Sequence, residues 1–299
     1  MVTAFDSTRA VVRAASAVSP RLGGRLATAA FFVTRPRMSL RAADSPTDLA
    51  ARRGTLQVGP HAVTTYQWGS GDRTVLLLHG WRGRASQFAP LVRELVADGF
   101  HVVSFDAPAH GESAGGRTDM RDWIAATEQL QRAHGRFDAI VGHSFGALAA
   151  LTAARNGVTT GAVAAISGAA SPEAFLGQFA GAFGLDAPTT AAFGRSFRAR
   201  VGEEAASPLR RYDAIADPLP PGVELLVVHD RGDRQMPPDD SLRLHAAHGP
   251  RSRLMLTDGL GHNRVLVADP VLDAVIAMAT GGLPAVDALL GDERERVAA

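Results

Sequence analysis

The sequence contains no cysteine and no lysine, so all 31 of its basic residues are arginines. The absence of cysteine excludes disulfides, thiolate metal sites and cysteine nucleophiles. The absence of lysine excludes Schiff-base chemistry, covalently held pyridoxal phosphate and the phosphate-loop lysine of nucleotide-binding proteins. Several large classes of thiol-dependent and cofactor-dependent enzyme are thereby excluded.

Net charge and long apolar runs are also lacking. The formal net charge is only +1, which gives no global field for attracting nucleic acid or acidic partners. No segment has the about 18 uninterrupted apolar residues of a membrane-spanning helix. With 46% hydrophobic and 20% charged residues, the 299-residue chain has the composition of an ordinary globular protein. We therefore expect a cytoplasmic protein with no nucleic-acid partner.

Residues 1–54 differ in charge from the rest of the chain. The first 43 residues contain seven arginines and a single acid, Asp6. Ser19 and Pro20 read as a helix N-cap and first turn, and apolar residues follow at helical spacing up to Val33. We interpret residues 1–54 as a basic, helical extension packed against the main domain or partly ordered as a leader. Peripheral membrane contact through residues 1–40 and a cleaved signal remain alternatives.

From residue 55 onward, buried apolar runs alternate with amphipathic segments. A hairpin at 55–68 is followed by strand-like runs with helical patterns between them. Continuous apolar strands separated by helices predict an α/β fold, with a mostly parallel sheet covered by helices on both faces. The predicted core comprises residues 55–168 and 214–280, with a C-terminal tail at 281–299. The expected core strands are 74–80, 101–106, 137–144, 162–167, 224–230 and 253–258.

An insertion at residues 169–213 contains no strand-like run and predicts a small helical cap. Its phenylalanines either line an apolar substrate pocket or form the core of the cap itself, and these are Phe175, Phe179, Phe183, Phe193 and Phe197. Several arginines are candidate ligands for an anionic substrate group, although solvated surface positions are the simpler explanation. These arginines are Arg82, Arg84, Arg195, Arg198, Arg200, Arg210 and Arg211.

The segment "GHSFG" (142–146) lies where a predicted strand turns into a helix. In this strand–turn–helix context the G-x-S-x-G pattern predicts a strained turn that projects Ser144 above the sheet. Side chains at Gly142 and Gly146 would collide with the neighbouring strand and helix. The helix N-terminus at Ser144 favours developing negative charge, and the backbone N–H of Phe145 is free to bind an oxyanion.

Four further motifs agree with this elbow, and together they resemble those of the α/β-hydrolase family. The resemblance covers about residues 55–280 and implies that the N–H of Trp81 is the second oxyanion donor. Departures from the usual motifs occur at Pro108-Ala109, at Asp230 in place of glycine, and at Met236 in place of valine. The motifs are "LLLHGWRG" (76–83), "FDAPAHGES" (105–113), "HDRGDRQMP" (229–237) and "GLGHNRV" (259–265).

The chemistry of serine catalysis requires two partner residues for Ser144, and the motifs supply candidates for both. A serine hydroxyl needs a neighbouring imidazole to accept its proton, and the imidazole needs a carboxylate to hold its tautomer. The family's chain order of serine, acid and histidine is matched by Ser144, Asp233 and His262. Asp230 is a rival for the acid, whereas the preceding strand end at 167–171 has no carboxylate.

We therefore expect a serine hydrolase that cleaves a small carboxylic ester, or a thioester, without a cofactor or a metal. His79, His110 and His143 are expected to support the site, and the histidine spacing shows no metal-binding motif. The alternatives are a triad-bearing small-molecule receptor and other chemistry on the same fold: acyl transfer, perhydrolysis or carbon–carbon cleavage. The sequence does not indicate the oligomeric state.

Overall fold

The computed structural model describes residues 4–202 and 210–298, with the side chains of Ala4, Arg210 and 292–298 excepted. The expected N-terminal extension, cap and C-terminal tail each include some of the remaining residues, 1–3, 203–209 and 299. Those residues, and the side chain of Arg210 considered above as an anion ligand, lie outside the described part of the chain.

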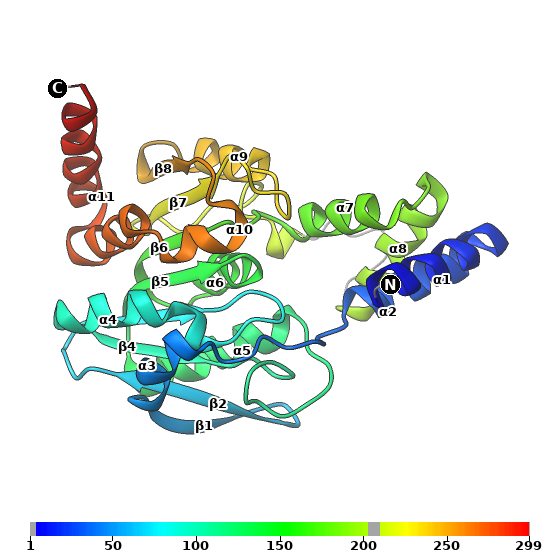
Figure 1. The fold of residues 1–299 in the computed structure, drawn as a ribbon, viewed down its shortest axis with the longest axis horizontal. Coiled ribbons are helices and arrows are strands. Elements are labelled where there is room, and N and C mark those ends of the chain that lie inside the picture. The colour runs from blue at the N-terminus through cyan, green and yellow to red at the C-terminus, as the bar shows by residue number, and fades with distance from the viewer. Residues whose placement is uncertain (1–3, 203–209, 299) are drawn as a thin grey trace.

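The described residues form an eight-stranded sheet in the order β1-β2-β4-β3-β5-β6-β7-β8 (Figure 1). The first two strands form an antiparallel hairpin whose second strand pairs antiparallel with β4, and all other pairs are parallel. The mostly parallel sheet is as predicted. The strands are β1 (Arg52–Val58), β2 (His61–Trp68), β3 (Thr74–Leu78), β4 (His101–Phe105), β5 (Phe137–His143), β6 (Thr160–Ile166), β7 (Glu224–Asp230) and β8 (Ser252–Thr257).

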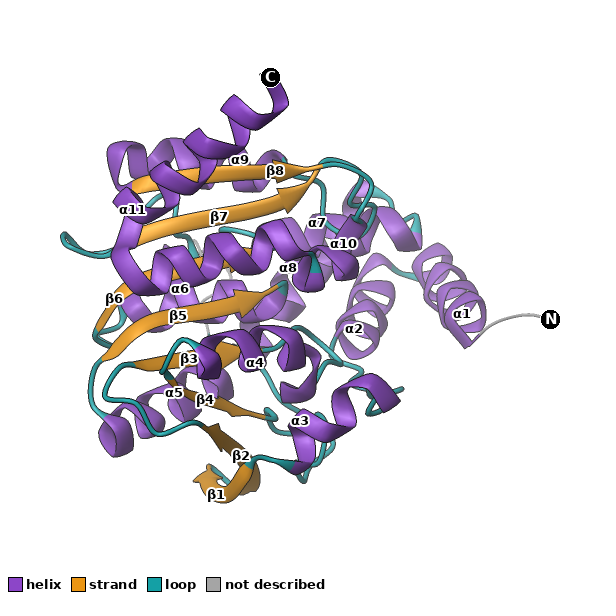
Figure 2. Ribbon diagram, turned by 60° about the vertical axis from the view of Figure 1, so that its left-hand side comes forward, coloured by secondary structure: helices purple, strands orange, loops and turns teal. Residues whose placement is uncertain are grey.

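Helices cover both faces of the sheet, which confirms the expected fold class (Figure 2). Successive side chains of a strand point to opposite faces. Leu76 therefore packs in the cluster that includes α5 and α6, and Leu77 packs in the cluster that includes α4 and α11. The helices of the core are α3 (Ser45–Leu49), α4 (Ala89–Ala97), α5 (Met120–His134), α6 (Phe145–Arg155), α9 (Asp239–His248), α10 (Gly261–Arg264) and α11 (Asp269–Ala298).

The expected boundaries of the core are wrong at both ends. β1 begins at Arg52, inside the predicted extension 1–54. At the other end, α11 continues past residue 280 with a break at Gly282, whose φ is 67°. Leu283 and Val286 follow this break and are only 5% and 0% exposed, so the first part of the expected tail 281–299 belongs to the core. Their apolar contacts with the sheet keep this part of the chain in the core beyond the break at Gly282.

The segment Asp269–Gly291 of α11 is long and apolar enough to cross a membrane by length and composition alone. One face of this helix packs on the sheet, where Val271 and Val275 are at most 1% exposed. About 33% of this apolar segment is buried in the structure, on the side that meets the sheet.

Four helices lie together beyond the carboxyl ends of the parallel strands (Figure 1). They are α1 (Ala4–Val18), α2 (Pro20–Phe31), α7 (Pro172–Phe183) and α8 (Ala187–Arg200), and we call them the four-helix lid. The sequence predicts α2 and the helical cap but not α1. The N-terminal helices pack against the cap helices rather than on the sheet, and Phe32 shares a buried cluster with Phe193 and Phe197.

Glycine makes the close approach of α2 to its neighbours feasible. A Cβ on Gly24 would lie 2.6 Å from the carbonyl carbon of Ala192 in α8. A Cβ on Gly23 would lie 2.3 Å from the Oγ of Ser16 in α1. Both distances are far below van der Waals contact, so side chains at these positions would push α2 away from both helices. The lid is therefore held together across a large separation in sequence.

Candidate active site

Ser144 occupies a sharp turn between β5 and α6, with φ 55° and ψ −119°. A Cβ on Gly142 would lie 2.3 Å from the carbonyl oxygen of Gly146, and one on Gly146 would lie 2.1 Å from the carbonyl oxygen of Leu78. These contacts confirm the prediction that both glycines are required on steric grounds. A positive φ at a non-glycine residue is strained, and such strain is concentrated at functional sites.

The structure brings Ser144, Asp233 and His262 into one hydrogen-bonded chain. The Nε2 atom of His262 lies 3.0 Å from the Oγ of Ser144, and its Nδ1 atom lies 2.7 Å from the Oδ2 of Asp233. Asp233 follows β7 and His262 lies on the short helix α10 after β8, so both reach the same edge of the sheet. Each of the three residues is at most 9% exposed. This spacing suits proton transfer from the serine to a histidine whose orientation the carboxylate holds.

Backbone groups as well as His262 hold the carboxylate of Asp233. Its Oδ1 accepts hydrogen bonds from the N–H groups of Gln235, at 2.8 Å, and Met236, at 2.9 Å. Burial alone would raise the pKa of Asp233. Hydrogen bonds from His229, His262 and Met236 outweigh this effect and hold the pKa well below its usual range. The carboxylate is therefore ionised at any pH near neutrality.

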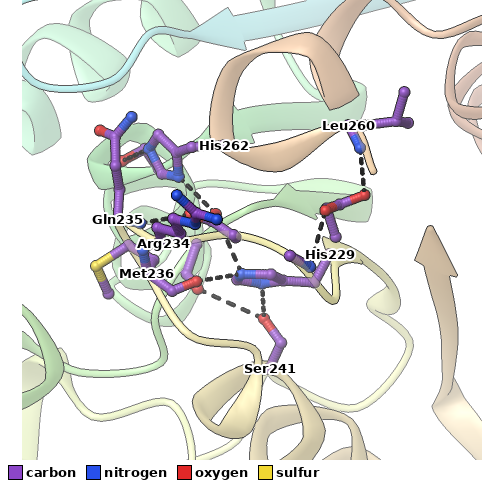
Figure 3. A network of polar contacts seen from close by, with 12 residues as sticks. His229, Arg234, Gln235, Met236, Ser241, Leu260 and His262 are labelled. Atoms are coloured by element: carbon purple, nitrogen blue, oxygen red, sulfur yellow. Dashed lines mark hydrogen bonds and ion pairs between the residues drawn. The ribbon is translucent and has the colours of Figure 1, made fainter. Parts of the chain in front are cut away.

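His229 fixes the loop that carries this carboxylate (Figure 3). Its Nε2–H donates to the carbonyl oxygen of Met236 at 2.7 Å, and its Nδ1 accepts a hydrogen bond from the Oγ of Ser241 at 2.7 Å. The side chain is fully buried. Its packed position agrees with its place at the end of a strand, but its contact with the acid loop is not predictable from the sequence.

Asp230 holds a different part of the site. Its Oδ2 accepts hydrogen bonds from the N–H of Leu260 and the hydroxyl of Thr257, both at 2.9 Å. Its Oδ1 accepts one from the N–H of Gly232. Among the hydrogen bonds of the described residues, none joins Asp230 to His262. Asp230 thus ties the end of β7 to the loop that presents His262, a role that the expected turn glycine at this position would not supply.

The two expected oxyanion donors each directly follow a residue at the turn, Phe145 after Ser144 itself and Trp81 after Gly80. Phe145 is the first residue of α6, so its N–H has no carbonyl four residues earlier in the helix to bind. Gly80 packs against the serine, because a Cβ built on it would lie 3.1 Å from the Cβ of Ser144. Trp81 follows Gly80 directly, and its indole Nε1–H donates to the carbonyl oxygen of Val33 at 3.0 Å. The N-terminal segment therefore anchors the loop that carries Trp81.

His143 supports the position of His262. Its Nε2–H donates to the backbone carbonyl of His262 at 2.8 Å, and its Nδ1 accepts a hydrogen bond from the Nε2 of Gln87 at 3.0 Å. Burial lowers the pKa of His143 to about 3, so the ring is neutral in the folded protein. The sequence predicts a supporting role but not its contact with the catalytic candidate 119 residues later in the chain.

His79 supports the Trp81 loop in a similar way. Its Nδ1–H donates to the carbonyl oxygen of Gly80 at 2.8 Å, and its Nε2 accepts a hydrogen bond from the N–H of Ala107 at 3.0 Å. Burial lowers its pKa to about 4. The neutral ring of His79 thus ties together two loops at the edge of the sheet.

A cavity of about 700 Å³ opens above the serine. Ser144 and His262 line it on the side of the sheet, and the lid supplies aromatic side chains from both of its halves. The cap phenylalanines divide between the two roles considered above. Phe193 and Phe197 are buried in the lid, whereas the phenylalanines that line the cavity are Phe5, Phe31, Phe145, Phe175, Phe179 and Phe183.

Of the two candidate anion ligands that follow β3, Arg82 lines the cavity and Arg84 does not. Arg82 lines the cavity and donates to the carbonyl oxygen of Val33. Arg84 is buried and paired with Asp48 and Glu112, so its charge serves the fold. Among the residues that the structure describes, no group of three or more histidine, aspartate or glutamate side chains is arranged to hold a metal ion.

The cap arginines lie away from the cavity lining. Arg198 pairs with Glu173, and the guanidinium groups of Arg200 and Arg211 lie over aromatic rings. Arg195 is exposed on α8. None of these four side chains lines the cavity above Ser144.

Several solved structures share this fold. An esterase from Pyrococcus furiosus has 20% sequence identity and a TM-score of 0.59, with 80% of this chain and 92% of that chain covered. The mouse alpha/beta hydrolase domain-containing protein 10 has 17% identity and a TM-score of 0.60, with 76% and 96% covered. A monoacylglycerol lipase from Paleococcus ferrophilus has 20% identity and a TM-score of 0.56, with 73% and 98% covered. At these identities the likeness shows the fold alone.

A search of curated proteins finds no match to this sequence, whereas a comparison with protein-family profiles does. The sequence profile described as "Alpha/beta hydrolase family" matches residues 75–277, more than half of the chain. The matched range runs from β3 to α11 and includes the elbow and both loops that carry its histidine and acid partners. With the sheet order and the elbow geometry, this match shows that the chain belongs to the alpha/beta hydrolase family.

Proposed function

We propose that the protein hydrolyses carboxylic esters or thioesters with an apolar acyl group, through an acyl-enzyme formed on Ser144. One observation carries the proposal. The hydrogen-bonded chain from Ser144 through His262 to Asp233 opens at the base of a largely apolar cavity. The same residues are in hydrogen-bond reach of one another in the order that serine hydrolysis requires.

In the acylation step, the Nε2 of His262 accepts the hydroxyl proton while the Oγ of Ser144 attacks the carbonyl carbon of the ester. The negative charge passes to the carbonyl oxygen, where the N–H groups of Trp81 and Phe145 would bind it. Each such donor typically lowers the activation barrier by about 3–4 kcal/mol. The tetrahedral intermediate then breaks its bond to the alcohol or thiol, which leaves with the proton from His262.

The deacylation step repeats this chemistry with water. His262 takes a proton from a water molecule as its oxygen attacks the acyl carbon, and the carboxylic acid leaves as Ser144 recovers its proton. Throughout both steps, Asp233 keeps the Nδ1 proton of His262 in place and stabilises the transient imidazolium. Its lowered pKa keeps it charged for this task.

The lining of the cavity supports an apolar acyl group. Phe175, Phe179 and Phe183 face it from α7, and Phe5 and Phe31 face it from the N-terminal helices. Its volume lies within the range of about 300–1,000 Å³ that is typical of small-molecule sites. Ester turnover on the purified protein, graded by acyl chain length and repeated with matched thioesters, gives the substrate class.

The nucleophile is tested by covalent labelling. A fluorophosphonate probe should label Ser144 in the wild type, and Ser144→Ala should abolish both labelling and turnover while the fold persists by circular dichroism. Ser70→Ala, at an exposed position, is the matched control and should behave as the wild type. A burst of aryl leaving group followed by steady turnover distinguishes an enzyme from a slow receptor. Labelling that persists at another serine in Ser144→Ala would contradict the proposal.

A further inference from the structure

Exposed large apolar side chains are concentrated in one part of the described chain. Eight such residues are at least a third exposed, and seven of them lie between residues 5 and 49. The eighth, Leu242, is on α9. Single exposed apolar residues are normal on proteins, whereas contiguous exposed apolar patches mark interaction sites. The seven are Phe5, Val11, Val18, Leu22, Val33, Met38 and Leu49.

Exposed apolar side chains recur on one side of α1 and on one side of α2, and we call these two sides together the apolar face. Val11 and Val18 are seven residues apart on α1, so they lie on the same side of that helix. Leu22 and Ala29 have the same spacing on α2 and are also exposed. Between the two helices runs an apolar groove of about 390 Å³. Its lining residues are Ser7, Thr8, Val11, Val12, Leu26, Ala29, Ala30 and Val33.

Charge is distributed unevenly along the chain. Residues 1–43 carry seven arginines and one acid, whereas the rest of the sequence carries 24 arginines and 29 acids. The small net charge therefore conceals a basic N-terminal segment on an acidic body. Arg25 is exposed and lies one helical turn from both Leu22 and Ala29, on the same side of α2. Arg13 on α1 and Arg21 on α2 are also exposed, and we call these two consecutive helices the α1–α2 hairpin.

The apolar groove adjoins the cavity above Ser144. Thr8, Ala30 and Val33 line both the groove and the cavity. These three residues therefore belong both to the groove between α1 and α2 and to the wall of the space above the nucleophile. A ligand on the outer face is therefore close to the route by which an apolar acyl chain would reach the serine.

From the apolar face, the arginines and the shared wall, we infer that the α1–α2 hairpin docks on the surface of an anionic phospholipid bilayer. Valine and leucine side chains enter the acyl region while arginines contact the headgroup phosphates, as in interfacial amphipathic helices. The acidic body of the protein is repelled by the same surface, which orients the lid toward the lipid. Docking in this orientation brings the cavity to the membrane.

Vesicle flotation tests this inference on the full-length protein, without any measurement of turnover. The probes are vesicles of phosphatidylcholine alone and of phosphatidylcholine with phosphatidylglycerol. We expect binding to the anionic vesicles that falls with added salt, and much weaker binding to the neutral ones. The double variant Val11→Asp/Leu22→Asp should reduce the bound fraction by at least about tenfold, since each change puts a carboxylate on the face that meets the lipid.

Matched controls separate this face from general surface effects. Leu242→Asp changes the exposed leucine on α9 and should bind vesicles as the wild type does. Arg21→Gln/Arg25→Gln should weaken binding to anionic vesicles only, whereas Arg132→Gln on α5 should leave it unchanged. Val11 and Leu22 do not line the cavity above Ser144, so hydrolysis of a short soluble ester should persist in the double variant.

Three results would overturn the inference. The first is wild-type protein that stays unbound with anionic vesicles at low salt. The second is a double variant that binds as well as the wild type. The third is a wild-type dimer that the double variant converts to a monomer by sedimentation, with no vesicle binding in either form. That last result would assign the face to a second copy of the chain. Because vesicle binding is measured without turnover, failure here is distinct from failure of the proposed hydrolysis.

Discussion

Replacement of Asp233 by asparagine tests whether the carboxylate holds His262 in the tautomer that leaves Nε2 free to accept the proton of Ser144. The Oδ1 atom of Asp233 accepts two backbone N–H groups, from Gln235 and Met236. An asparagine would keep its carbonyl oxygen there, because its NH₂ group cannot accept those hydrogen bonds. The NH₂ group would then face Nδ1 of His262, which would have to accept a hydrogen bond. The remaining ring proton would move to Nε2, the atom that must accept the proton of Ser144.

The expected loss is large because the base is present but in the wrong tautomer. In a serine protease with the same three groups, this change lowers turnover by about 10⁴, which corresponds to roughly 5.5 kcal/mol in the barrier. We expect a loss of at least about 10² in kcat for Asp233→Asn, with little change in KM. The assay is steady-state hydrolysis of an aryl ester, with the unfolding temperature of each variant measured alongside.

Asp230→Asn is the matched control. Asp230 accepts hydrogen bonds from Leu260, Thr257 and Gly232, so an amide there leaves one donor facing another. We expect the free energy of unfolding to fall by about 1–3 kcal/mol, with a much smaller effect on kcat. A folded Asp233→Asn enzyme that retained most of its turnover beside an inactive Asp230→Asn would refute the assignment of the acid.

Two further predictions concern the cavity and the buried imidazoles. Phe179→Ala should enlarge the cavity and shift the preferred acyl chain toward longer esters, measured as kcat/KM across a chain-length series, and an unchanged series would show that the lid does not bound the acyl group. Burial lowers the pKa of His79 to about 4 and those of His110 and His143 to about 3, below the ordinary value of 6.5. As the pH falls below 6.5 the unfolded chain takes up protons that the folded protein does not, so urea midpoints should decrease between about pH 6.5 and 4. Each imidazole contributes roughly 1.4 kcal/mol per pH unit to this loss, and a flat profile over that range would mean that these rings are protonated in the fold.

Local patterns account for what the sequence determined. The alternation of apolar strands and amphipathic helices predicts the sheet, because a strand that is buried on both faces must be apolar along its whole length. The elbow is predictable for the same reason, since Gly142 and Gly146 act on atoms close to Ser144 in the chain or at the adjacent strand end. Motif order then leads to His262 and to an acid in the segment 229–237.

Tertiary structure alone decided the relations between distant segments. The motif favours Asp233 over Asp230 as the acid, but the contact itself depends on how the loops after β7 and β8 face each other, and only the structure shows that Asp233 reaches His262. The N-terminal helices illustrate the same limit. Their partner is α8, more than 150 residues later, and the contact rests on a glycine at position 24 that looks like a helix weakness in isolation. Amphipathic sequence predicts that a helix needs a partner, but long-range packing selects which one, and here that selection builds the cavity and leaves an apolar face exposed.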